Sequence, residues 1–233
     1  MNRTGLCIAL GVGAVVGVVF GVFPQLDLTI SGWFFDPRIH DFPINAERWA
    51  QNSRDAARAL IGVLLAPAVL APLGKLLLPR RRMLISGSTV IFLILTFALG
   101  PGLITNSLLK EHWGRARPID VTEFGGTDRF TAWWDPRGDC PGNCSFIAGE
   151  PAGAFWTLAP AALAPPQWRA LGYGAALGFG SAVGALRIAG GGHFFTDVVF
   201  AGVIMFALIW TLYGAIYRWW PARKGAKPDT PDE

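Results

Sequence analysis

The sequence predicts an all-α integral membrane protein in which six transmembrane helices form a bundle. Of the 233 residues, 52% are hydrophobic and only 15% are charged, and the mean hydropathy is +0.39. Soluble domains carry about 25% charged residues. The 29 glycines and 10 tryptophans fit the same class, because glycine lets membrane helices approach closely and tryptophan favours the membrane–water interface.

Six apolar segments approach the roughly 20 residues that a membrane-spanning helix needs. Along the chain they cover 6–23, 56–78, 84–109, 146–164, 170–189 and 194–217. The first follows Arg3 as a signal peptide would, but Pro24 and Gln25 stand where a small-residue cleavage site is expected, so we predict an uncleaved span. The fourth and fifth are rich in Gly, Ala and Pro, which predicts that they face other helices rather than lipid.

The connections between these segments predict the orientation of the chain. Six spans place both termini on one side, where the connections are short and basic; their cations are Arg3, Arg80, Arg81, Arg82, Arg169 and those of the C-terminal tail. The positive-inside rule then predicts cytoplasmic termini in a bacterial inner membrane. The long connections 24–55 and 110–145 are expected in the periplasm, with a helix over 45–60 lying on the membrane surface.

The domain organisation is simple. Residues 1–220 are expected to form one integral-membrane domain, and 221–233 a polar cytoplasmic tail. The formal net charge is +4, but the basic residues form no continuous stripe. Binding of nucleic acid is therefore not expected, and we expect the chain to be embedded in the lipid bilayer.

A basic cluster ends the third apolar segment. It contains Lys110, Arg115 and Arg117. Arginine pairs with phosphate oxygens at two points, and lysine adds a compact positive charge, so all three are candidate phosphate-binding residues. The alternative is a basic flank that anchors the helix among lipid headgroups.

An acidic residue, Glu150, stands near the start of the fourth apolar segment. A helix start offers free backbone N–H groups that bind anions, so we include Gly149 among the candidate phosphate-binding residues. A poorly solvated carboxyl group can retain a proton and act as a general acid. The alternative is that Glu150 is a helix-start acid or the ion-pair partner of one of the arginines.

A third cluster joins the fifth and sixth segments and contains Arg187, His193 and Asp197. His193 and Asp197 are four residues apart and would share one face of a helix. A carboxylate on one imidazole nitrogen orients the other toward a substrate. The alternative is a structural His–Asp hydrogen bond. The predicted topology places all three clusters on one membrane face, where such a set suits attack on a phosphate dianion.

The spacing of these residues resembles the type 2 phosphatidic acid phosphatase superfamily. The family signatures K-x6-RP and R-x5-H-x3-D correspond to Lys110 with Arg117-Pro118 and to Arg187, His193 and Asp197. The resemblance implies a phosphoric monoester hydrolase with a phosphohistidine intermediate and no required metal or other cofactor. It implies that His193 is the nucleophile, that Asp197 orients it, and that Lys110, Arg117 and Arg187 bind phosphate.

The middle motif departs from the usual P-S-G-H of the superfamily. Ala148 stands in place of the serine and Glu150 in place of the histidine. In this respect the chain is similar to one branch, the bacterial lipid A 4'-phosphatases, which have an acidic residue at this position and paired loop cysteines before it. The resemblance implies that Glu150 is the acid and that lipid A is the substrate.

Other functions stay open. The same motifs serve phosphatases of undecaprenyl pyrophosphate, phosphatidylglycerol phosphate or phosphatidic acid. A non-catalytic membrane protein that binds phosphorylated lipids is a further alternative, because Ala148 lacks the serine hydroxyl.

Cys140 and Cys144 lie in the second long connection. A disulfide is compatible with a periplasmic loop, although spacing alone does not fix its geometry. No metal site is expected, because the polar stretch around the two cysteines adds no further Cys or His.

Overall fold

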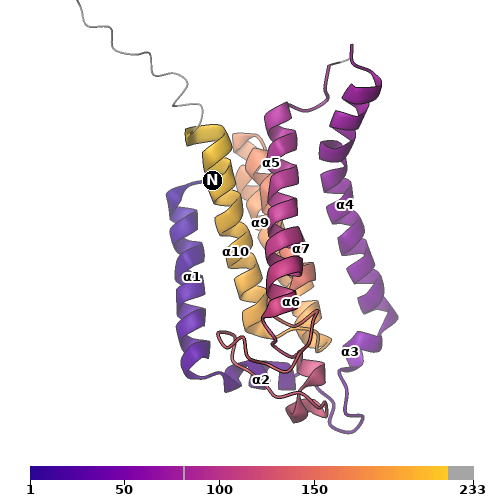
Figure 1. Ribbon diagram of the computed structural model, residues 1–233, viewed down its shortest axis with the longest axis vertical. Coiled ribbons are helices and arrows are strands. Elements are labelled where there is room, and N and C mark those ends of the chain that lie inside the picture. The colour runs from indigo at the N-terminus through magenta and orange to yellow at the C-terminus, as the bar shows by residue number, and fades with distance from the viewer. Residues whose placement is uncertain (81, 220–233) are drawn as a thin grey trace, which may run out of the picture.

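The computed structural model describes residues 1–80 and 82–219, and its long helices run side by side in a bundle (Figure 1). The described part contains helices and two isolated β-bridges but no strand. The elements are α1 (Arg3–Val22), α2 (Gln25–Gly32), α3 (Pro43–Ala46), α4 (Arg48–Leu77), α5 (Gly87–Phe97), η1 (Ala98–Leu109), α6 (Lys110–His112), η2 (Pro118–Asp120), η3 (Thr122–Phe124), α7 (Gly149–Phe155), α8 (Leu158–Leu163), α9 (Pro166–Ala189), α10 (Phe195–Gly214) and η4 (Ala215–Trp219). The predicted tail 221–233 lies outside the described residues.

Four helices of the described chain are long and apolar enough to cross a membrane. They cover Arg3–Val22, Arg48–Leu77, Gly87–His112 and Phe195–Trp219, which correspond to the first, second, third and sixth predicted segments. The fifth segment forms the single helix α9, which is less apolar. The fourth segment forms two shorter helices, α7 and α8, separated at Trp156 and Thr157.

The second span is longer than the sequence indicated. The predicted surface helix over 45–60 is wrong, because α4 runs without interruption for 30 residues from Arg48 and only the short α3 precedes it. The polar residues at the start of α4 are part of the span. One of them, Arg54, forms an ion pair with Glu150 of α7.

The third span changes its helical form before it reaches the basic cluster. From Ala98 to Leu109 the chain is π-helical and contains Pro101, which cannot supply a backbone N–H to a regular helix. Gly100 lies against Met205 of α10, where a Cβ atom would collide with the methionine sulfur. Glycine at this position therefore lets the two spans approach closely. Lys110 follows directly.

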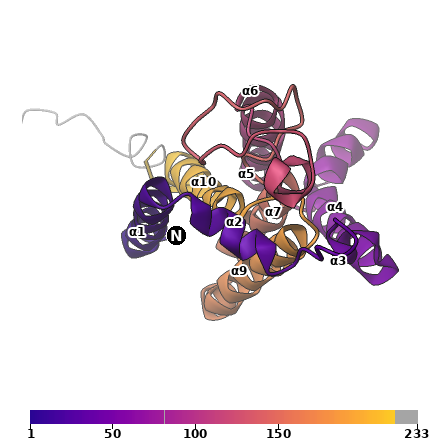
Figure 2. The same cartoon turned by 90° about the horizontal axis from the view of Figure 1, so that it is seen from below.

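The helix α2 and the connection 113–148 cover one end of the bundle, as the view from below shows (Figure 2). A small apolar cluster holds these segments together; its buried members are Phe42, Ala116, Val121, Phe124 and Phe194. Burial of such side chains contributes roughly 1.5–3 kcal/mol each for the large ones. The cluster thus fixes the connection next to the start of α10, where the predicted catalytic and phosphate-binding residues lie.

Candidate active site

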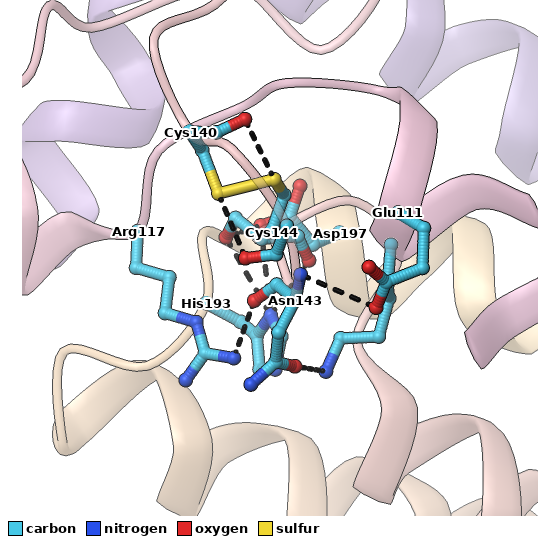
Figure 3. The surroundings of a disulfide bond; sticks show 10 residues. Glu111, Arg117, Cys140, Asn143, Cys144, His193 and Asp197 are labelled. Atoms are coloured by element: carbon cyan, nitrogen blue, oxygen red, sulfur yellow. Dashed lines mark hydrogen bonds and ion pairs between the residues drawn. A yellow bond between two sulfur atoms is a disulfide. The ribbon is translucent and has the colours of Figure 1, made fainter. Parts of the chain in front are cut away.

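Asn143 links two of the predicted phosphate-binding cations (Figure 3). Lys110 Nζ donates a hydrogen bond to its Oδ1 at 2.8 Å, and Arg117 Nη2 donates to its backbone oxygen at 2.6 Å. Its φ of 51° lies in the left-handed region, which asparagine tolerates better than most residues. Lys110 and Arg117 therefore both contact one residue of the connection.

A disulfide between Cys140 and Cys144 closes the turn that carries Asn143. The turn is also tied to the basic cluster through its backbone, because the N–H of Cys144 donates to the Lys110 carbonyl at 2.8 Å. In addition, the Asn143 N–H lies 3.3 Å from Oε1 of Glu111. The cross-link therefore restrains the residue that contacts both cations.

Arg187 is the third predicted phosphate-binding cation, and it is buried at the end of α9 with 6% of its surface exposed. Its Nε has no hydrogen-bond partner in the part of the chain that the structure describes. A buried guanidinium without a partner is costly, and a phosphate oxygen would satisfy it. Gly192 lies directly against this guanidinium, so any larger residue there would displace it.

His193 lies in the short connection between α9 and α10 and is 2% exposed. Its Nδ1 is 2.8 Å from the backbone oxygen of Ser145. Since a carbonyl oxygen only accepts, Nδ1 carries the proton and Nε2 keeps its lone pair. Burial, reinforced by the charges of Arg187, Lys110 and Arg117, lowers the pKa of His193 well below its usual 6.5. The imidazole is thus neutral and suited to nucleophilic attack.

The predicted direct pairing of Asp197 with His193 is wrong in detail. Because α10 begins at Phe195, His193 precedes the helix, and its Nδ1 lies 4.0 Å from Asp197 Oδ2. Ser145 lies between them; its hydroxyl donates to Asp197 Oδ2 at 2.5 Å. Asp197 also accepts from the Phe194 N–H at 2.8 Å. Ser145 therefore contacts both Asp197 and His193, and the sequence reasoning missed this serine.

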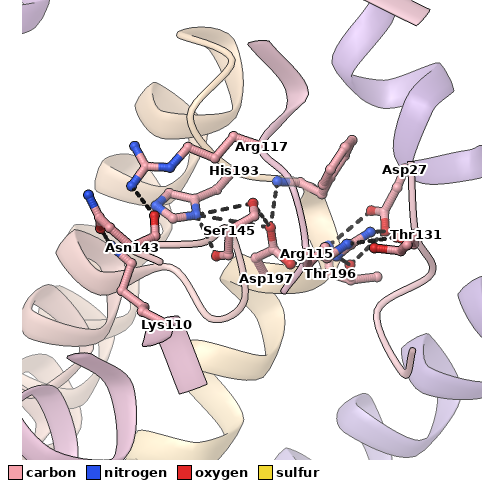
Figure 4. A network of polar contacts seen from close by, with 11 residues as sticks. Asp27, Lys110, Arg115, Arg117, Thr131, Asn143, Ser145, His193, Thr196 and Asp197 are labelled. Atoms are coloured by element: carbon pink, nitrogen blue, oxygen red, sulfur yellow. Dashed lines mark hydrogen bonds and ion pairs between the residues drawn. The ribbon is translucent and has the colours of Figure 1, made fainter. Parts of the chain in front are cut away.

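Arg115 occupies a different environment from that of Arg117 (Figure 4). Its side chain is fully buried, and it forms ion pairs with Asp27 at 2.7 Å and Asp197 at 2.5 Å. It also donates to the hydroxyl of Thr196 and to the backbone oxygen of Thr131. The prediction that Arg115 binds substrate phosphate conflicts with this placement, because each guanidinium nitrogen already has a protein partner. Arg115 instead joins α2, the connection and α10.

Glu150 at the start of α7 pairs with Arg54 of α4. Arg54 Nη2 donates to Oε1 at 2.6 Å and Nε to Oε2 at 2.9 Å, so the contact is a two-point ion pair. This is the ion-pair alternative for Glu150, with a partner that the sequence reasoning missed. Gly149 lies nearby; a Cβ built there would be 3.6 Å from Lys110 Nζ. Arg54 and Arg187 line one small cavity, which brings this pair next to the buried cation.

The missed residues carried weak signals in the sequence. Arg54 is a charge that precedes a long apolar run, and such charges are functional hypotheses by default. Asp27 and Ser145 lie in the stretches after the first segment and before the fourth, but their partners come from distant parts of the chain. Among the described residues, no group of three or more His, Cys, Asp or Glu side chains is arranged to hold a metal ion.

Sequence comparisons relate this chain to known proteins. The PAP2 superfamily profile matches residues 90–222. The lipid A 4'-phosphatase of Francisella tularensis subsp. novicida is 30% identical over 219 residues, which is 94% of this chain and 98% of that protein. The lipid A 4'-phosphatase of Rhizobium leguminosarum is 35% identical over 120 residues, 50% of this chain and 52% of that protein. That of Rhizobium etli is 33% identical over 117 residues, 49% of this chain and 46% of that protein. No solved structure gives a significant match.

Proposed function

The chain belongs to the PAP2 superfamily, and from this membership we propose that it is a bacterial inner-membrane phosphatase that removes a phosphate monoester from lipid A. It is a membrane lipid phosphatase by family and by its apolar helices. The match to a lipid A 4'-phosphatase over 98% of that relative's length supports the substrate. One observation carries the reaction: a neutral histidine, His193, lies buried beside Arg187, whose buried Nε has no hydrogen-bond partner among the described residues.

We propose that the substrate phosphate binds to Lys110, Arg117 and Arg187. These cations neutralise the charge that the transition state spreads over the phosphate oxygens. Nε2 of His193 then attacks phosphorus, and the bond between phosphorus and the sugar oxygen breaks. The Ser145 carbonyl holds the Nδ1 proton during attack, and Asp197 restrains the hydroxyl of Ser145.

Glu150 is proposed to protonate the departing sugar oxygen. The ion pair with Arg54 must loosen for this step. A bound phosphate dianion would compete with Glu150 for Arg54 and Arg187, and this competition releases the carboxyl group to carry a proton. Water then attacks the phosphohistidine, so that inorganic phosphate leaves and His193 becomes free again. Ala148 contributes no polar side chain, whereas the backbone N–H of Gly149 at the start of α7 is proposed to donate to a phosphate oxygen beside Lys110.

The proposed topology has six spans, with α7–α8 and α9 completing the bundle beside the four long apolar helices. Both termini would be cytoplasmic and the site periplasmic. Support comes from the basic connections at the end opposite the site, which include Arg80, Arg82 and Arg169. A disulfide next to the site also suits an oxidising compartment.

The experiment is phosphate release from purified lipid A in detergent without added metal, with mass spectrometry to locate the lost group. His193→Ala should abolish release while the protein stays folded, and His40→Ala, which changes an exposed histidine, should retain it. Release from His193→Ala at the normal rate refutes the mechanism. Release from an isoprenoid pyrophosphate, phosphatidylglycerol phosphate or phosphatidic acid but not from lipid A would retain the mechanism and refute the proposed substrate.

A further inference from the structure

A large cavity lies between α1, α9 and α10, toward the end of the bundle opposite the active site. Figure 1 shows how these three helices are arranged. The volume of the cavity is about 690 Å³. Most of its wall is apolar; Ile8, Val12, Leu177, Val203 and Phe206 are typical of it. The proposed phosphatase reaction uses none of these residues.

One end of this cavity is basic. Arg169 and Arg218 line it together with Tyr173. Arg169 Nε donates to the backbone oxygen of Ala164 at 3.1 Å, and the Arg218 guanidinium lies 5.4 Å from the centre of the Tyr213 ring. Within the described residues neither arginine forms an ion pair with a carboxylate, so both charges are open to an anionic ligand.

The surrounding sequence offers these arginines no acidic partner nearby. The described segments 1–10, 160–175 and 205–219 contain no Asp or Glu. The hydroxyl of Tyr173 is buried, and within the described chain it has no hydrogen-bond partner. Arg169 and Arg218 lie close enough for their positive charges to interact electrostatically with this hydroxyl. Three polar groups therefore converge at one end of an apolar cavity, and among the described residues none of them contacts a carboxylate.

The length of the cavity fits one leaflet of a bilayer. Along α9 it extends from Arg169 to Ser181, which is about 18 Å at the helical rise per residue. Half of the hydrocarbon core of a bilayer is about 15 Å thick. A chain that starts at the arginines would thus reach roughly to the middle of the membrane.

We propose that this cavity binds an anionic phospholipid of the leaflet opposite the active site. Its phosphate would pair with Arg169 and Arg218, Tyr173 would donate to an ester or phosphate oxygen, and one acyl chain would lie between α1 and α9. Arginine forks suit phosphate oxygens, and basic pockets between membrane helices bind anionic headgroups. A zwitterionic headgroup fits less well, because its ammonium would face two guanidinium groups that have no carboxylate beside them among the described residues.

The test is native mass spectrometry of the purified full-length protein in detergent, titrated with phosphatidylglycerol or with phosphatidylcholine. The wild type should retain phosphatidylglycerol at least tenfold more tightly than phosphatidylcholine. The double substitution Arg169→Ala with Arg218→Ala should remove this preference. Arg82→Ala, which changes an exposed arginine of the short connection between α4 and α5, should preserve it.

Two further variants keep the proposal refutable if the double alanine variant does not fold. Arg169→Lys with Arg218→Lys keeps both charges and should retain most of the preference for phosphatidylglycerol. Leu177→Trp fills the apolar wall and should weaken retention of both lipids although the arginines remain. Equal binding of the two lipids by the wild type would overturn the proposal. So would unchanged binding in Leu177→Trp, or a cavity closed by a second copy of the chain that excludes lipid.

Discussion

Replacing Asp27 by alanine tests whether Arg115 stabilises the fold or binds substrate. Asp27 is 1% exposed, and its Oδ2 accepts from Arg115 at 2.7 Å and from the Thr196 hydroxyl at 2.6 Å. Its Oδ1 accepts from the backbone N–H of Thr196 at 3.1 Å. The substitution leaves a buried guanidinium with Asp197 as its one remaining carboxylate partner. Breaking a buried pair from one side typically costs about 3–5 kcal/mol.

The expected shift in melting temperature follows from this free energy. For chains of 150–250 residues, each kcal/mol lowers the melting temperature by about 2–4 °C, so Asp27→Ala should melt roughly 6–20 °C below the wild type. The assay is thermal unfolding of the purified protein in detergent. Asp36→Ala is the matched control, because the pair of Asp36 with Arg38 is exposed and exposed pairs contribute little. It should melt close to the wild type.

Steady-state kinetics also distinguish a structural role of Arg115 from a role in substrate binding. Asp27 contacts none of the proposed phosphate-binding cations, so at a temperature well below its melting point the variant should keep the wild-type KM for the phosphorylated lipid. Arg117→Ala should raise KM instead, with a smaller effect on melting. Wild-type melting of Asp27→Ala, or a KM increased as much as in Arg117→Ala, would refute the structural role.

Three further predictions concern the site itself. Glu150→Gln, which also weakens the pair with Arg54, should lower kcat more for a sugar phosphate than for nitrophenyl phosphate, because the latter leaving group needs no proton; this ratio is measured with purified enzyme. Cys144→Ser should raise KM about tenfold, equivalent to about 1.4 kcal/mol, because Asn143 loses its restraint; steady-state kinetics check this. His193 has a folded-state pKa below 6.5, so unfolding takes up a proton as pH falls below that value. Wild-type melting should therefore fall more steeply below pH 6.5 than that of His193→Gln.

For each of these three predictions, a particular result would contradict the reasoning. An equal loss of kcat on both substrates would show that Glu150 does not protonate the leaving group. Cys7→Ser, which changes an exposed cysteine outside the disulfide, should keep the wild-type KM, and an unchanged KM in Cys144→Ser shows that the cross-link does not restrain the site. Parallel pH profiles of the wild type and His193→Gln contradict a buried neutral histidine.

Hydropathy predicted the spans that face lipid and was less informative for those that face protein. The helices α1 and α4 are long and apolar, and they expose large apolar side chains such as Val18 and Leu70 at the surface of the bundle. In contrast, α7 is buried from Pro151 to Phe155, so small residues suffice and the hydropathy signal is weak. The break between α7 and α8 lies at Trp156 and Thr157. Pro160 lacks the backbone N–H that a regular helix would donate to the Trp156 carbonyl, so the sequence did contain a signal for it.

The family spacing predicted candidate residues that lie at one end of the bundle, but it did not predict their hydrogen bonds. The family spacing named Lys110, Arg117, Arg187 and His193, and the structure places them at one end of the bundle. The four-residue separation of His193 and Asp197 predicted a shared helix face, which failed because α10 begins after the histidine. Nothing local distinguishes Arg115 from Arg117, because the partners of Arg115 come from α2 and α10.

The central claim is that His193 forms a covalent bond to phosphate during turnover. The most direct test mixes the purified enzyme with lipid A, stops the reaction in alkali at short times, and searches the peptides by mass spectrometry. We expect a transient phosphohistidine on His193 that appears before free phosphate and is absent from His193→Ala. Phosphate release at the full rate with no modified His193 at any time, or with another residue modified, would contradict it.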